Sequence, residues 1–403
     1  MSDNQSGSAR TDRPNLDQKR KLAKDLLRSV RRLDADQARR FTWNLPRFRG
    51  KSGHDVVRDG VNLADSQHVI ARESGFESWR ELTEYVRQLD EHPGGDLAAF
   101  ENAVRAIIRG EVTTLKRLLV EHPQLATMRS ARHHRAVLPH YIAANGVENE
   151  HQITPRNAVE VAEILFAAGG DAVIDATADF YGGGGGSTPL VALVTSAHPH
   201  DAGVQADLVH AFCAAGANPN GIEDDGLPIA SAIGFRYPEA AIALADKGAR
   251  VDNAVSAAAL GRIDLLREFC EGGHAMASAA CTFHNPLLSL PESRVPHPDQ
   301  TLGQGFVFAC MSGKLEAASY LLERGVDVNV GPRKGITALH EAAYQGRTDV
   351  VEYLIRHGAN PVLRDDHWNS TPIGWADGGK QPQVIDYLFG LDRVDFLDAV
   401  ELR

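Results

Sequence analysis

The sequence predicts an all-α fold in which short helix pairs stack into an α-solenoid, and three observations predict it. Residues 338–356 form two apolar helical patterns that Gly346 separates. Gly358 follows the second pattern, as expected for a helix end, because only glycine takes a positive φ without a steric cost. The same two glycines occur 33 residues earlier, at Gly313 and Gly325. A fixed period of this length is the signature of a repeat protein.

The segment 333–365 carries a specific pattern of small, apolar and polar residues. Its members are Gly335, Thr337-Ala338-Leu339-His340, Ala342-Ala343, Gly346, Leu354-Ile355 and Gly358-Ala359-Asn360. With these residues the segment closely resembles an ankyrin repeat. One such helix pair cannot bury its apolar face alone. The resemblance therefore implies about eight ankyrin-like repeats with β-turn or hairpin fingers, preceded by a small helical module.

Four parts of the chain are predicted from composition and pattern. They are a disordered lead at 1–14, a helical N-terminal module at 15–93, the repeat array at 96–390, and a C-terminal tail or short helix at 391–403. A Pro-Gly-Gly run at 93–95 suggests the boundary between module and array. The module contains LADSQHVIARESGFESWRELTEYV, which resembles a leader ahead of bacterial ankyrin arrays.

Charge is divided unevenly along the chain. Residues 1–60 hold 15 Lys and Arg against 8 Asp and Glu, a net charge of +7, which leaves −18 for the remainder out of the total of −11. An acidic array argues against nucleic acid as the partner of the repeats. The basic segment, at residues 19–58, could contact nucleic acid, an anionic surface or the protein's own acidic body.

Several features indicate a cytoplasmic protein. We expect no membrane span, because the apolar runs are shorter than the roughly 18 residues of a membrane helix. The N-terminus is polar and lacks the apolar core of a secretory signal. The cysteines form no Cys-x-x-Cys pair, which favours reduced thiols; they are Cys213, Cys270, Cys281 and Cys310.

The second to fifth repeats, at about 133–302, depart from the regular pattern. Insertions at 147–157 and 196–204 fall at the turn between paired helices. The Gly-rich run at 181–189 and the long run at 274–301 fall in finger positions. Binding residues usually lie on such loops of a rigid scaffold. We therefore place the functional site in this region.

The leading hypothesis is a non-catalytic scaffold that binds a protein partner through the concave face and fingers of these repeats. Tyr and Arg favour interface hot spots, and His and Asn supply polar recognition. The predicted binding residues are His134, Tyr141, Asn145, Tyr181, His200, Arg236 and Tyr237. The acidic array favours a partner with a basic face.

The alternative is a small-molecule enzyme that uses acid–base groups in the same region. Its candidate catalytic residues are His140, Tyr141, Glu148, Tyr181, His198 and His284. Such groups would have to converge on an enclosed pocket of roughly 300–1,000 Å³. For His140 and His340 the resemblance implies a structural hydrogen bond to neighbouring backbone instead. We expect no cofactor, and no metal, because the pair at His198 and His200 lacks a third ligand with supporting spacing.

Overall fold

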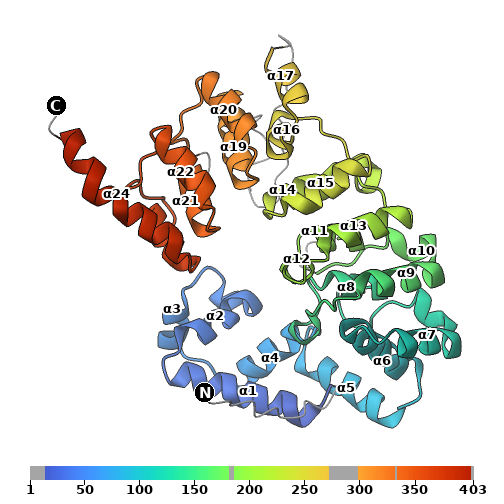
Figure 1. The fold of residues 1–403 in the computed structure, drawn as a ribbon. Helices are drawn as coiled ribbons and strands as arrows, with labels where there is room; N and C mark the ends of the chain where they lie inside the picture. The colour runs from blue at the N-terminus through green and yellow to red at the C-terminus, as the bar shows by residue number, and fades with distance from the viewer. Residues whose placement is uncertain (1–13, 181–185, 272–297, 332–333, 401–403) are drawn as a thin grey trace, which may run out of the picture. The chain divides into compact units, whose positions relative to one another are not determined.

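The computed structural model describes residues 14–180, 186–271, 298–331 and 334–400, with backbone alone at 298–300 and 392–400 (Figure 1). Its regular elements are helices, which confirms the all-α class. In the described residues a β-bridge pairs Ala178 with Ser187. The chain separates into two compact units, Met1–Ala217 and Asn218–Arg403. The predicted repeat array spans the boundary between them.

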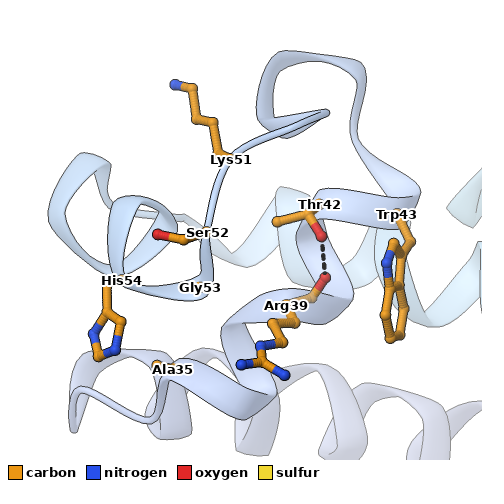
Figure 2. Close-up of a pocket in the computed structure, with 8 residues that line it drawn as sticks. All are labelled: Ala35, Arg39, Thr42, Trp43, Lys51, Ser52, Gly53 and His54. Carbon is orange, nitrogen blue, oxygen red and sulfur yellow. Dashed lines mark hydrogen bonds between the residues drawn. The ribbon is translucent and has the colours of Figure 1, made fainter. Parts of the chain in front are cut away.

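The first unit begins with helices that form their own core. They are α1 (Leu16–Arg31), α2 (Ala35–Asn44), the 3₁₀ helix η1 (Pro46–Phe48), α3 (Gly53–Asp59), α4 (Leu63–Glu73) and α5 (Trp79–Glu91). Phe41, Phe48 and Val69 are buried where these helices meet. Ser78 caps α5 by accepting a hydrogen bond from the Glu81 N–H, as its position before the helix predicts. A shallow hollow lies between α2 and α3 (Figure 2).

Three helix pairs follow in the first unit. Its elements are α6 (Asp96–Arg109), α7 (Val112–Glu121), η2 (Pro123–Ala126), α8 (Leu138–Ala143), η3 (Asn149–His151), α9 (Ala158–Gly169), α10 (Asp171–Ile174), α11 (Pro189–Val194), α12 (Ala197–Asp201) and α13 (Gln205–Ala214). The contacting pairs are α6 with α7, α8 with α9, and α11 with α13. The two predicted insertions contain η3 and α12. The bridge of Ala178 to Ser187 forms the base of a finger, and the glycine-rich tip lies outside the described residues.

The second unit contains five described helix pairs. Its elements are η4 (Ile222–Asp224), α14 (Leu227–Gly234), α15 (Pro238–Asp246), α16 (Ala254–Leu260), α17 (Ile263–Glu271), α19 (Pro298–Met311), α20 (Leu315–Glu323), α21 (Ala338–Tyr344), α22 (Thr348–Arg356), α23 (Pro372–Gly378) and α24 (Pro382–Val400). Helices α21 and α22 begin and end within the two patterns predicted at 338–356, on either side of Gly346. Gly346 and Gly358 have φ of +72° and +87°, which explains the glycines that end the two helices.

Histidine connects neighbouring repeats, as the family resemblance implies. His340 accepts the Thr337 N–H at Nδ1 (3.3 Å) and contacts the Ser370 carbonyl oxygen through Nε2 (3.1 Å). His140 repeats this arrangement with the Val137 N–H (3.3 Å) and the Ser187 carbonyl oxygen (2.9 Å). An Nδ1 that accepts leaves the proton on Nε2, which then donates. Both imidazoles are therefore neutral structural groups that join one repeat to the next.

The structure also places the cysteines and shows the apolar character of the helices. Cys310 is buried, and burial raises the pKa of its thiol. Cys213 and Cys270 are half-buried, and Cys281 lies outside the described residues. Across the described ranges, no helix has the length and apolar character needed to cross a membrane.

Candidate functional site

The two insertions of the first unit fold into short helical turns that contact each other. The first insertion forms η3, and the second forms α12. The His198 imidazole lies 3.3 Å from the Gln152 side-chain oxygen, so a hydrogen bond joins the two turns. Ile153 remains half exposed, at 49%, although it is a large apolar residue. Adjacent repeats thus contribute to one continuous surface of inserted residues, which we call the insertion surface (147–157 and 196–204).

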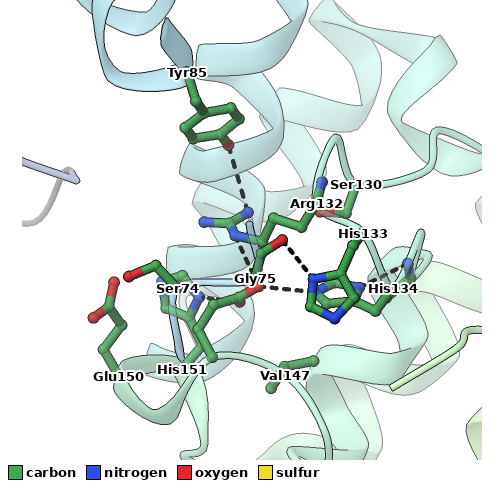
Figure 3. Close-up of polar contacts among 12 residues, drawn as sticks. Ser74, Gly75, Tyr85, Ser130, Arg132, His133, His134, Val147, Glu150 and His151 are labelled. Carbon is green, nitrogen blue, oxygen red and sulfur yellow. Dashed lines mark hydrogen bonds and ion pairs between the residues drawn. The ribbon is translucent and has the colours of Figure 1, made fainter. Parts of the chain in front are cut away.

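A cluster of buried polar side chains lies behind the first insertion (Figure 3). It consists of Tyr85, Glu101, Arg132, His134, Glu148 and His151, and we call it the Arg132 cluster. The Arg132 guanidinium contacts Glu101 at 2.6 Å and Glu148 at 2.7 Å. The side chains of these three residues are at most 4% exposed. Burying charges at this depth is costly unless they are paired, and here each is paired.

Glu148 is the most highly connected carboxylate of the cluster. Nε2 of His134 lies 2.8 Å from one of its oxygens, and Nδ1 of His151 lies 2.9 Å from the other. Burial alone would raise the pKa of the Glu148 carboxyl, but the Arg132 charge and the two imidazole hydrogen bonds hold it well below its ordinary value. The carboxylate is therefore ionised and fully engaged by protein groups.

The second carboxylate, Glu101 on α6, has fewer partners. It accepts hydrogen bonds from Arg132 and from the Tyr85 hydroxyl on α5. Burial would raise the pKa of this carboxyl, and the Arg132 charge and hydrogen bond lower it instead. Burial lowers the pKa of the Arg132 guanidinium, and the two carboxylates raise it. The net effect is a rise. The cluster therefore connects the N-terminal helices, the first repeat and the first insertion.

Two further contacts join the N-terminal helices to this region. The carbonyl oxygen of Gly75 accepts from the backbone N–H of His133 at 3.0 Å and lies 2.7 Å from Nδ1 of its ring. Lys19 on α1, which is itself buried, forms an ion pair with Glu150 at 2.8 Å. The N-terminal helices thus pack against the first repeats within the first unit, a question that the sequence leaves open.

Gly75 occupies a position that no other residue fits well. Its φ of +83° lies in the left-handed region, and a Cβ there would lie 2.9 Å from Cδ of Arg132 and 3.0 Å from a Glu148 oxygen. Both the backbone and the available space therefore require glycine. The turn between α4 and α5 approaches the cluster this closely only because the side chain is absent.

Several predicted site residues are in the interior, which corrects their placement at a surface. His134 and Tyr141 are 2% and 0% exposed, so neither can contact a partner as predicted. Burial raises the pKa of the Tyr141 phenol. Glu148 belongs to the Arg132 cluster. These residues differ from a regular repeat because they build a polar core, and not because they face a ligand.

The remaining catalytic candidates lie in separate settings. Burial lowers the pKa of His140 to about 4, and both of its nitrogens are used for repeat packing. His198 is half-buried at the junction of the insertions. Tyr181 and His284 lie outside the described residues. Among the residues that are described, no group of three or more His, Cys, Asp or Glu is arranged to hold a metal ion.

The other predicted binding residues lie at or near the surface of their own units. Asn145 is half-buried and donates to the Thr195 hydroxyl at 2.7 Å. His200 on α12 is exposed. In the second unit Arg236 is exposed, has φ of +70°, and contacts Glu341 at 2.7 Å, while Tyr237 beside it is half-buried.

Sequence reasoning missed the residues that connect the cluster to the rest of the unit. They are Lys19, Gly75, Tyr85, Glu101 and Arg132. One signal was present in the sequence: an Arg-His-His run at 132–134 precedes the acidic pair in the inserted Glu-Asn-Glu at 148–150. Opposite charges flanking a short helix indicate that the two segments meet.

Comparison with known proteins locates the repeats independently. The family model described as ankyrin repeats (3 copies) matches residues 255–365. The putative palmitoyltransferase ZDHHC13 of Danio rerio is 36% identical over 100 residues, which cover 23% of this chain and 16% of that protein. The E3 ubiquitin-protein ligase hecd-1 of Caenorhabditis elegans is 46% identical over 59 residues, 15% of this chain and 2% of that protein.

The solved ankyrin repeat domain of human ASB11 is also similar, with a TM-score of 0.35 and 18% identity, covering 71% of this chain and 96% of that one. The chain spans about a sixth or less of the two relatives named above, so their activities are not transferred to it. The family match, the helix pairs and the histidine contacts between repeats agree with one another. The chain therefore contains ankyrin repeats, which the family model locates at residues 255–365.

Proposed function

We propose that the chain is a protein-binding scaffold whose recognition surface in the first unit is the insertion surface. Ankyrin repeats typically bind proteins, and this chain carries them. The repeats supply a rigid framework. Residues that depart from the repeat pattern and remain exposed are the ones available for a specific partner.

One observation supports this placement above the others. The insertion surface is held from behind by the Arg132 cluster, in which Glu148 is engaged by one guanidinium and two imidazoles. Loops that serve only as connections need no such support. A binding loop does, because a surface that is already ordered loses less conformational entropy when a partner binds.

The charge of the chain indicates the chemistry of the partner. Residues 61–403 carry a net charge of −18, so a protein with a basic face would be attracted over a distance of about one Debye length. Association should therefore slow as salt increases. A cytoplasmic setting, with a partner present in the same compartment, is part of this proposal.

Site-specific crosslinking tests the placement. A photoreactive phenylalanine analogue replaces Ile153 on the insertion surface, and in a matched variant it replaces Val120 on α7, since both are exposed apolar residues, at 49% and 79%. Irradiation in the source cell should give a discrete protein adduct from position 153 and none from position 120. Unlabelled wild-type chain should compete for the adduct, and an Ile153→Asp chain should compete poorly.

Two results would contradict the proposal. Equal adducts from both positions would indicate nonspecific contact. If the unlabelled Ile153→Asp chain prevented adduct formation as effectively as the unlabelled wild type, the partner would bind elsewhere. Formation of the adduct should also decrease between about 50 and 200 mM salt when the partner is purified. A salt-independent interaction would remove the basic face from the proposal while leaving the insertion surface in place.

A further inference from the structure

The hollow between α2 and α3 has features that the scaffold function does not use. It is an open depression with a volume of about 180 Å³, and its lining includes Arg39, Trp43, Lys51 and His54 (Figure 2). We call it the Trp43 hollow. Enclosed sites for drug-sized ligands measure about 300–1,000 Å³, so this one accepts a single ring or a single phosphate and leaves the rest of a ligand outside.

Trp43 is exposed to a degree that packing does not explain. Its side chain is 78% exposed, while Phe41, two positions earlier on the same helix, is fully buried. Within the described part of the chain, the indole has no aromatic, cationic or hydrogen-bond partner. A large aromatic face that neither stabilises the core nor contacts a neighbour is a surface on which another ring can stack.

The cations that line the hollow are only partly neutralised. Arg39 is four residues before Trp43 and therefore on the same face of α2; its nearest carboxylate is Asp36, at 3.9 Å and mostly exposed. Lys51 is paired with Asp59 at 2.7 Å. Surface pairs of this kind contribute about 0–1 kcal/mol and exchange readily with a competing anion. The hollow thus combines an aromatic face with available positive charge.

Additional cations lie close along the chain to residues that line the hollow. Arg31 and Arg32 precede Ala35, which lines it, and Arg49 lies in the loop before α3; all three are exposed and have no carboxylate within ion-pair distance in the described residues. The shape of the hollow is fixed by Gly53, because a Cβ there would lie 2.0 Å from the Ala35 carbonyl oxygen. The start of α3 is therefore seated directly on the start of α2.

We propose that the Trp43 hollow binds single-stranded nucleic acid, with one base stacked on Trp43 and the backbone phosphates contacting Arg39 and the surrounding arginines. Aromatic stacking beside a basic track is how sequence-tolerant single-strand sites work. An acidic peptide would use the guanidinium groups and leave the indole face uncovered. A membrane surface would need a second large apolar side chain, and none of the lining residues supplies one besides Trp43.

The test is fluorescence anisotropy of the full chain with labelled oligothymidine and oligouridine of about 15 nucleotides, at about 50 mM salt. Trp43→Ala should weaken binding by about 5- to 150-fold, the range for loss of one base–aromatic stack, and Trp43→Phe should restore most of it. Arg39→Gln should reduce the slope of log affinity against log salt by about 0.7. Trp368→Ala, at another exposed tryptophan, 63% exposed in the second unit, is the matched control and should bind as the wild type does.

Each other outcome overturns the proposal. Failure of the wild-type chain to bind either oligonucleotide would remove the site, and so would equal loss in Trp43→Ala and Trp368→Ala. Tighter binding to polyglutamate than to oligothymidine would indicate an acidic-peptide site. Binding to phosphatidylserine vesicles, retained in Trp43→Leu but not in Trp43→Ala, together with no oligonucleotide binding, would indicate a lipid surface. Circular dichroism of each variant establishes that the helices are intact.

Discussion

Replacing Arg132 by Met should strongly destabilise the first unit, and the size of the effect follows from the groups that the guanidinium leaves behind. Among the described residues, Glu148 would retain two imidazole partners, whereas Glu101 would retain the Tyr85 hydroxyl alone. The Glu101 side chain is 4% exposed. Removing one partner of a buried ion pair costs about 3–5 kcal/mol, because the remaining charge is uncompensated. We expect a loss of that size at pH 7.

The pH dependence of the loss identifies its cause. Without the guanidinium, burial raises the pKa of the Glu101 carboxyl above its ordinary value of about 4.3. A carboxyl with a raised pKa in the folded state costs stability at high pH, and the cost decreases as the pH falls through that pKa. The difference between variant and wild type should therefore be largest near pH 7–8 and smaller near pH 5. The added substitution Glu101→Gln should recover much of the loss.

Hydrogen exchange measured by mass spectrometry across a urea series is the appropriate assay. It reads each helix separately, so unfolding of the first unit is not confused with that of the second. The urea midpoint for α6 and α8 should decrease in Arg132→Met, and the midpoint for α21 should not change. A loss below about 1 kcal/mol, or a loss that is the same at pH 5 and pH 8, would refute the electrostatic reasoning.

Two further predictions use the same assay. Gly75→Ala should destabilise the first unit by about 1–3 kcal/mol, because the new Cβ meets Arg132 and Glu148. Gly60→Ala is the control for the backbone contribution, because Gly60 has φ of +75° and open space around it. Equal losses of stability in the two variants would contradict the close packing at Gly75. Wild-type stability should fall by about 2 kcal/mol between pH 6.5 and 5 because of His140: its pKa is lowered to about 4, so the unfolded chain takes up the proton first. His140→Gln should flatten this dependence, and an unchanged slope would assign it to another group.

The repeat pattern could be predicted from the sequence because it depends on residues that are close together in the chain. The bounds of α21 and α22 follow from apolar spacing within a dozen residues and from glycines that terminate helices at positive φ. The paired hydrogen bonds of His140 and His340 follow from the same motif, which recurs at equivalent places in two repeats. Each of these features depends on residues that lie close together in the chain, so one repeat serves to interpret another.

The burial of the residues that depart from the repeat pattern could not be predicted from the sequence. His134, Tyr141 and Glu148 depart from the repeat pattern, and a departure alone does not distinguish a binding surface from a polar core. The answer depends on Tyr85 and Glu101, which lie 47 and 31 residues before Arg132 and come from different helices. No periodicity relates such positions.

The sequence by itself determined the helix pairs, the glycine-terminated turns, the histidine contacts and the region where the array becomes irregular, because these depend on short-range spacing and backbone sterics. Only the tertiary structure decided that the irregular region encloses Arg132, that Gly75 seats the N-terminal helices against it, and that Trp43 remains exposed. Those outcomes depend on which distant side chains share one buried volume, where desolvation forces every charge to find a partner.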